Sequence, residues 1–313
     1  MATFASGSGF GVSYVKEDVF GVTPANPEMR RLRITSSSVG VSKEGFQSNE
    51  LRSDRQISDY RQGTYQVSGD MGIEFSFAEF DDILAASVGG NWEDAADASG
   101  KKHLVAGTTE TSFTIEQEYL KLTGDKFERF TGMKVNTLSL SVPVNGMVTG
   151  TVGFVGADAN WAASPLDTTP TDSFAYSPFD GLQGQLLEGG VQNAVVTAVE
   201  LSIDNGMEAQ YVLYQKAAGA ITEGRINITG TVSAMFENVA MLNKFLKEQE
   251  SSIALTFGDG VNQSYTLTLP RIKYTGGDKS VDGEGVIALS MPFQALLDPA
   301  TGTNIRIDRF PAL

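Results

Sequence analysis

Three residues have side chains suited to catalysis: the adjacent acids Asp81 and Asp82, and the lone histidine His103. A pair of carboxylates can hydrolyse a glycoside, and a histidine can act as general base in a nucleophilic triad. Asp81 and Asp82, however, stand at the start of a predicted short helix, where acids stabilise the positive end of the helix dipole. His103 falls in a predicted loop, with no second His, no Cys and no G-x-S-x-G motif. We therefore predict no catalytic residues.

Metal and cofactor sites are equally weakly indicated. The absence of cysteine removes disulfides, thiol chemistry and thiolate zinc sites. Glu93, Asp94 and Asp97, the other acids considered for glycoside hydrolysis, lie in a Gly- and Ala-rich loop that does not fix two carboxylates across a substrate. The stretch FGDGVNQ, residues 257–263, has the character of a hairpin turn and lacks the acid spacing of a calcium loop. We predict neither a metal nor a cofactor.

The segment 49–63, NELRSDRQISDYRQG, is strongly polar and its charges balance. It could be a nucleic-acid grip, a catalytic cluster or an arm that docks on another protein. Balanced charge disfavours binding to nucleic acid, and no second residue suited to catalysis accompanies these side chains. Arginines form bidentate pairs with carboxylates, which set register at an interface. We predict a docking arm over residues 43–64 that carries Glu50, Arg52, Asp54, Arg55, Asp59 and Arg61.

Composition limits the other function classes. The chain has 313 residues, a formal net charge of −15 and 34 glycines against 10 prolines. Such a charge disfavours stable binding to nucleic acid, which needs clustered Lys and Arg. Residues 151–200 contain six acids and no Lys or Arg, as a solvated acidic linker also would. No apolar run could span a bilayer, and the N-terminus lacks the pattern of a signal peptide, so we expect a soluble protein made in a cytoplasm.

Clean alternation predicts two similar strands, at 65–77 (YQVSGDMGIEFSF) and 226–236 (INITGTVSAMF). Their apolar positions coincide when V67-S-G is set over I228-T-G. Each strand precedes a segment with helical spacing of apolar residues, AEFDDILAAS and NVAMLNKFLKEQ. These two blocks begin a series that indicates an internal repeat.

Two further blocks follow in the same order. S112-F-T-I…K121-L-T-G matches S264-Y-T-L…K273-Y-T-G, and L140-S-V-P-V matches L289-S-M-P-F. We therefore predict a tandem duplication, with a first unit over 1–156 and a second over 193–313. Residues 157–192 are the predicted Pro-, Gly- and Ser-rich connector, and 205–224 are the counterpart of the arm.

Small β units of this kind leave sheet edges open, and proteins pair or cover such edges. Two similar open sheets can pair with each other and then with the next chain. Heterologous pairing of this type closes into a ring when the rotation fits, and a closed barrel has no edges.

The runs VFGVTPANPEMRRLRITSSSV and KEGFQSNELRSDRQISDYRQGTYQVSGDMGIEFSFAEFDDILAASVGG resemble the tail tube proteins of long-tailed, non-contractile (siphovirus-type) bacteriophages. GRINITGTVSAMFEN and NIRIDRFP are similar to the same family, so the resemblance covers nearly the whole chain. It implies a mainly β chain of two tandem β-sandwich or barrel units, each with one short α-helix, that assemble into a closed β-barrel ring. Such rings stack into a hollow virion tail tube that is built in the host cytoplasm.

The resemblance also implies partners. The chain would pair with itself in trimeric, pseudo-sixfold rings, or alternatively in hexameric rings. It would contact the tape-measure protein and the tail-tip and tail-terminator proteins, while double-stranded DNA passes through the lumen without stable binding and no membrane is involved. An acidic lumen repels the phosphates of DNA, so the DNA finds no site in the channel at which to bind. Asp70 and Glu74, on the polar face of the strand at 65–77, are the lumen candidates; an outer solvated face is the alternative.

Other functions stay open at this point. The tube of a contractile tail has a similar inner fold. A β-sandwich that binds carbohydrate or protein would be expected to carry a signal peptide. A β-rich hydrolase would need convergent acids in a pocket. The missing signal peptide counts against the binding module, the missing acid cluster counts against the hydrolase, and a neighbouring sheath gene would support the contractile tail; the non-contractile tube is preferred.

Overall fold

The structure is a computed structural model that describes residues 4–95, 100–193, 195–258, 263–281 and 283–311. Antiparallel strands dominate these residues, and only two short α-helices interrupt them. The prediction of a mainly β chain with two helices is confirmed. No helix in the described part of the chain is long and apolar enough to cross a membrane.

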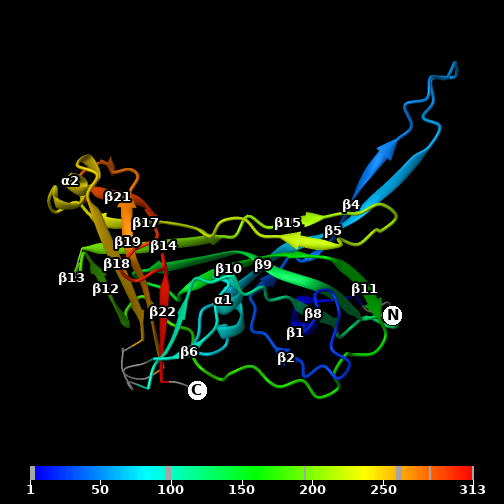
Figure 1. The fold of residues 1–313 in the computed structure, drawn as a ribbon, viewed down its shortest axis with the longest axis horizontal. Coiled ribbons are helices and arrows are strands. Elements are labelled where there is room, and N and C mark those ends of the chain that lie inside the picture. The colour runs from blue at the N-terminus through cyan, green and yellow to red at the C-terminus, as the bar shows by residue number, and fades with distance from the viewer. Residues whose placement is uncertain (1–3, 96–99, 194, 259–262, 282, 312–313) are drawn as a thin grey trace.

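A long central sheet runs through the whole molecule (Figure 1). Each strand in it pairs antiparallel with the next, and a short strand lies beside the sheet near each end. In order, the strands are β4 (Gly40–Gln47), β5 (Tyr60–Glu74), β10 (Thr149–Gly156), β9 (Phe127–Pro143), β14 (Val196–Asp204), β17 (Asn227–Met235) and β21 (Ala288–Ala295), with β3 (Ser36–Ser37) beside β5 and β20 (Asp278–Ser280) beside β21.

Two smaller sheets cover the apolar face of the central one. The first contains β2 (Arg30–Arg31), β1 (Phe10–Lys16), β8 (Phe113–Tyr119), the N-terminal half of β9 and β11 (Asp158–Ala162). The second contains β13 (Val191–Gln192), β12 (Gly184–Glu188), β18 (Glu250–Phe257), β19 (Ser264–Tyr274), β22 (Arg306–Phe310), β7 (Lys102–Val105) and β6 (Glu93–Asp94). β9 and β19 each run from a covering sheet into the central sheet, which ties the layers together.

The remaining elements lie at the margins of these sheets. β15 (Glu208–Gln210) and β16 (Ala220–Thr222) form a two-stranded hairpin, and residues 7–9 form a short 3-10 helix. The helix α1 (Asp81–Ser87) is almost entirely buried, whereas α2 (Ala240–Leu246) buries only Met241. Both helices occupy the positions that the sequence predicts.

The two halves of the chain pair their strands in the same order. In the covering sheets, the order β1–β8–β9–β11 of the first half matches the order β12–β18–β19–β22 of the second half. In this order β8 corresponds to β18 and β9 to β19. In the central sheet, the order β4–β5–β10 matches the order β14–β17–β21. The sequence blocks 112–121 and 264–273 instead fall on β8 and β19, and the blocks that begin at Leu140 and Leu289 fall on β9 and β21, although β10 corresponds to β21. Both of these parts of the predicted alignment are therefore wrong by one strand.

The central sheet does not close on itself within one chain. Among the described residues, β4 pairs only with β5, and β20 pairs only with β21. The label β4 lies at one end of the long axis in Figure 1, and β21 lies at the other. One buried apolar cluster, from Val12 to Ile307, joins both halves of the chain.

Candidate functional site

The two faces of the central sheet differ sharply in polarity. Directly paired residues share a face, so the register of the strands assigns each side chain. The face turned to the covering sheets is apolar and buried, for example at Met71, Val152, Leu138 and Ile203. The opposite face, here called the polar face, consists of Asp70, Gly72 and Glu74; Thr149, Thr151 and Gly153; Thr137, Ser139 and Ser141; Glu200, Ser202 and Asp204; and Asn227, Thr229 and Thr231.

Four acids stand at these positions, none of which is Lys or Arg. The pairing of Asp278 with Ser290, and of Ser290 with Ser233, places Asp278 of β20 on the same face near its end. Glu74 and Glu200 lie in one row of paired residues, and Asp70 and Asp204 lie in another, in each case three strands apart. At about 4.8 Å per strand, the two acids of a row are about 14 Å apart. The four acids form no ion pair with any described residue, so their charge is directed into solvent.

The polar face is concave. One open hollow of about 750 Å³ is lined by residues from β5, β10, β9, β14, β17 and β21 together. The lining is mostly Ser, Thr and Gly, with Glu200 as its acid. The sequence prediction placed Asp70 and Glu74 on a polar strand face, and the structure adds Glu200 and Asp204 to that face.

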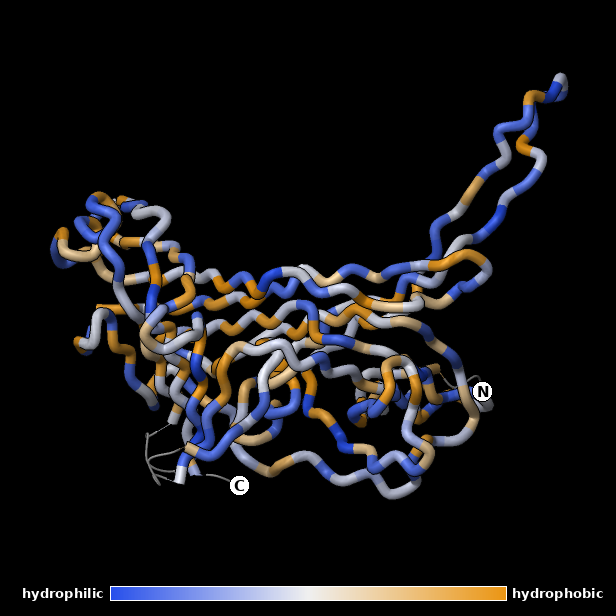
Figure 2. The backbone as a smooth tube through the Cα atoms, viewed as in Figure 1, coloured by the Kyte–Doolittle hydropathy of each residue, from blue (hydrophilic) through white to orange (hydrophobic). Residues whose placement is uncertain are grey.

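The first arm, residues 43–64, projects from the body as a long hairpin (Figure 1). β4 and β5 continue into it with paired residues as far as Gln47 and Tyr60, so only the tip lacks strand pairing. Strand pairing therefore forms the base of the predicted arm. In Figure 2 the arm is mostly hydrophilic, with a few apolar positions that include the exposed Leu51 and Ile57.

The charged residues of the arm pair mainly with one another. Arg52 donates to both oxygens of Asp54, at 3.0 and 2.7 Å, and lies 3.8 Å from Glu50. Arg61 donates to Asp59 at 2.9 Å. These hydrogen bonds hold the pKa of Asp54 and of Asp59 below its usual range. Arg55, at the tip, has a left-handed backbone (φ 61°) and makes no ion pair with any described residue.

The second arm, residues 205–224, lies along the first half of the chain instead of projecting. The hydroxyl of Tyr211 donates to the carbonyl of Tyr65, and the Ala218 amide donates to the Ala157 carbonyl. Lys134 is buried beneath this arm, where it donates to Glu110, Glu223 and the Ile221 carbonyl. The two arms therefore have the same topological origin but different surroundings.

The residues considered for catalysis are structural. Asp81 is buried against Arg309 and accepts a hydrogen bond from Tyr265, while Asp82 contacts Lys16 and Tyr14. His103 belongs to β7 and lies 3.7 Å from Glu93, so its prediction as an exposed loop residue is wrong. Asp97 and most of the predicted turn at 257–263 fall outside the described residues.

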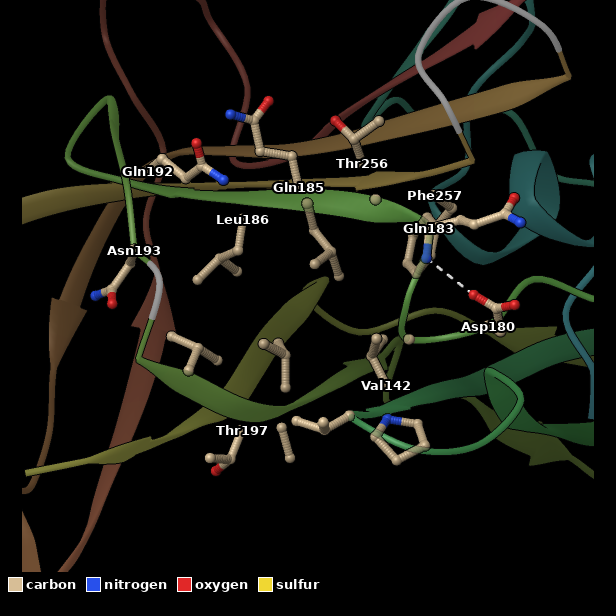
Figure 3. Close-up of a pocket in the computed structure, with 18 residues that line it drawn as sticks. Val142, Asp180, Gln183, Gln185, Leu186, Gln192, Asn193, Thr197, Thr256 and Phe257 are labelled. Carbon is tan, nitrogen blue, oxygen red and sulfur yellow. Dashed lines mark hydrogen bonds between the residues drawn. The ribbon is translucent and has the colours of Figure 1, made fainter.

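A second hollow, of about 190 Å³, lies between β12 and β18 on one side and the ends of β9 and β14 on the other (Figure 3). The amides of Gln185, Gln192 and Asn193 stand at its rim, and its only acid is Asp180. Asp180 accepts the backbone N–H of Leu182 and of Gln183, so it caps a turn. This hollow has no pair of groups for acid–base chemistry, and no cluster of His, Asp or Glu suited to a metal occurs among the residues that the structure describes.

The chain matches a known protein family. A family described as phage tail tube protein matches residues 7–295. No curated protein matches the chain.

Proposed function

We propose, because this chain belongs to the phage tail tube protein family, that it forms the tube of a long, non-contractile tail. Family membership implies a structural subunit of the virion tail that assembles with further copies of itself into a tube.

The polar face is the observation that carries the proposal. It is concave, acidic and free of Lys and Arg, and it is built on a sheet whose two ends stay open. Several copies joined through these ends would surround a channel lined by Asp70, Glu74, Glu200 and Asp204. Double-stranded DNA would then slide past acids that repel its phosphates, without a site at which to bind.

The ring is proposed to contain three chains. The matching order of strand pairings supports two tube units per chain, over 1–156 and 193–313, joined by 157–192. The ends of this connector form β11 and β12, and the backbone N–H of its Phe174 binds the buried Glu79. Three chains would supply six units and a pseudo-sixfold ring that closes the sheet into a barrel; six chains per ring is the alternative.

The first arm is proposed to dock on a neighbouring ring. It projects well beyond the body (Figure 1), and its tip exposes Leu51, Ile57 and the unpaired Arg55. Contacts of this kind would fix the register between rings more than they add affinity. Glu50, Arg52, Asp54, Asp59 and Arg61 would hold the hairpin in shape or exchange partners on docking.

The remaining partners follow from the role of a tail tube. The tube would enclose the tape-measure protein and bind tail-tip and tail-terminator proteins at its ends, after synthesis in the bacterial cytoplasm. The tube of a contractile tail is the second candidate; a contractile sheath around assembled tails would favour it.

Electron microscopy of the purified protein at high concentration tests the proposal, with class averages viewed down the axis. Hollow rings of three chains are expected. Rings of six chains would keep the tube and overturn the pseudo-sixfold ring. Monomers that also fail to assemble on a purified tail-tip complex would overturn the tube itself.

A further inference from the structure

The central sheet passes from the first half of the chain to the second at one strand pair, and this junction is a template for contact between chains. β9 pairs antiparallel with β14 over seven residue pairs, from Ala198 with Pro143 to Asp204 with Thr137. This pairing carries the central sheet from the first half of the chain into the second. Within one chain this kind of junction occurs once, because the described part of the central sheet ends at β4 on one side and at β20 on the other.

Each strand of the junction has a counterpart in the other half. β14 pairs with β17 in the second half, and β4 pairs with β5 in the first. Ser202 is opposite Thr229 and Gly40 is opposite Ser68, so Ser202 corresponds to Gly40 when β5 is superposed on β17. β9 pairs with β10 in the first half, and β19 and β20 together pair with β21 in the second. Ser139 is opposite Thr151 and Asp278 is opposite Ser290, so Ser139 corresponds to Asp278 when β10 is superposed on β21.

A shared irregularity supports the second correspondence. The ladder between β9 and β10 shifts its register between Gly153 and Phe154. The ladder against β21 shifts by one residue at the matching place, between the pair Asp278–Ser290 and the pair Tyr274–Phe293. A bulge is a specific feature of a strand pair, so its repetition fixes the register of the comparison.

The two helices differ in the same way: α1 is covered by the other half of the chain, and α2 is not. α1 is buried by the second half of the chain, through Asp81 with Arg309 and through the Ser87 carbonyl with Asn205. α2 has no such cover: Val239 is 54% exposed and Leu246 is 66% exposed. Since the Leu242 and Phe245 side chains of α2 lie beside Gly277, immediately before β20, one neighbour could cover both α2 and β20.

Charge supports a second copy as that neighbour. The Asn205 side chain donates at 3.0 Å to the Ser87 carbonyl at the C-terminal end of α1 and to the Val135 carbonyl. Lys43 of β4 is the counterpart of Asn205. If a second copy is placed as β14 is placed against β9, its Lys43 would lie at the C-terminal end of α2, close to Glu248. A cation is stabilising at the C-terminal end of a helix. Lys43 makes no ion pair with any described residue of its own chain.

We infer that β20 of one copy pairs antiparallel with residues 38–40, which lead into β4, of the next copy in the same ring, with Asp278 opposite Gly40, and that this contact covers α2. The inference rests on the proposed assembly into rings and specifies the surfaces that close them. All three residues of β20 are exposed, and so is Ser38 in the segment opposite; Val39 turns its side chain into the core and Gly40 is half-buried. The contact is heterologous and joins opposite ends of the molecule.

Cysteine cross-linking tests the register, because the chain has no native cysteine. Paired antiparallel residues have Cα atoms about 4.5–5.5 Å apart, which suits a disulfide. A Cβ at Gly40 meets nothing nearer than 3.9 Å, so cysteine fits there. An oxidised assembly of mixed Asp278→Cys and Gly40→Cys chains should contain linked dimers. Either variant alone should contain none, and Val41→Cys in place of Gly40→Cys, which points to the other face, should lower the yield at least about tenfold.

The outcomes separate the two proposals. Tubes that form without the Asp278–Gly40 link would overturn this junction and leave the tube intact. Linked dimers without tubes would support the junction and count against the tube. Absence of both at high concentration and on a tail-tip complex would overturn both.

Substitution on α2 gives a second, independent test. Leu246→Glu should leave a folded monomer, because the side chain is exposed, but should weaken ring formation at least about tenfold. Leu182→Glu, at a site that is 75% exposed and outside the junction, is the matched control and should assemble normally. Normal rings from Leu246→Glu would contradict the cover of α2.

Discussion

The carboxylate of Asp81, at the start of α1, pairs with the guanidinium of Arg309 in β22, across 228 positions of sequence. Both side chains are buried, and the Tyr265 hydroxyl also donates to Asp81. Burial holds the pKa of Arg309 below its usual range, and the Asp81 carboxylate offsets part of the cost of burying that charge. This contact fastens the end of the chain to the helix of its first half.

Replacing Asp81 by Asn should therefore destabilise the fold. Arg309 would keep its buried charge and lose its counter-charge, a loss of about 3 kcal/mol in the free energy of unfolding. Asp82→Asn is the matched control, because Asp82 is 28% exposed and its ion pair with Lys16 should contribute about 1 kcal/mol or less. Denaturant unfolding of the two variants checks the difference. Equal midpoints would show that the buried pair adds nothing.

The acids of the polar face give a prediction about DNA passage. In the variant Asp70→Lys with Asp204→Lys, one acid row becomes basic and should attract phosphates. We expect tails that assemble but eject DNA roughly tenfold more slowly at low salt, with recovery as salt rises, since phosphate contacts weaken steeply with salt. Time-resolved release of DNA from purified virions measures this.

A charge-matched variant separates channel charge from total charge. Asp125→Lys with Asp172→Lys makes the same change in net charge at exposed sites outside the polar face. Its ejection rate should match that of the unmodified tail. Equal slowing in both variants would place Asp70 and Asp204 outside the channel.

Local patterns in the sequence predicted the local elements well. Alternation over 65–77 and 226–236 corresponds to β5 and β17, and the helical spacings correspond to α1 and α2. These elements are predictable because one buried side imposes a period of two or 3.6 on the side chains. Asp70 and Glu74 were assigned to the polar side of a strand for the same reason, and the register of β5 with β10 agrees.

Relations between strands were harder to predict. Alternating strands resemble one another, so the block at 112–121 matched β19 although its structural counterpart is β18. Glu200 and Asp204 were missed because their place on the polar face depends on the pairing of β14 with β9, which no local pattern indicates. The contact of Asp81 with Arg309 was missed for the same reason. Pairing across 50 or more residues is a property of the fold as a whole.

Lys134 anchors the second arm and gives a local prediction. Its buried ammonium binds Glu110, Glu223 and the Ile221 carbonyl, so Lys134→Met should free residues 208–222 from the body. We expect amide exchange in that hairpin to quicken at least about tenfold, since the loss of even one charge-assisted hydrogen bond, worth about 1.5–3 kcal/mol, gives a change of that size. Lys126→Met, at a half-exposed site with one partner, should leave exchange there unchanged. An unaltered hairpin in Lys134→Met would mean that other contacts hold the second arm.

Reversal of the arginines on the first arm tests its docking role. Arg52→Glu with Arg55→Glu should give folded subunits that form rings but do not stack, because the body does not depend on the arm tip and the arm loses its cations for a neighbouring ring. Circular dichroism should be unchanged, while electron micrographs should show single rings in place of tubes. Lys121→Glu with Arg306→Glu makes the same change in charge on the body and should stack normally, since both side chains are exposed and away from the arm. Normal tubes from the arm variant would show that Arg52 and Arg55 do not join one ring to the next.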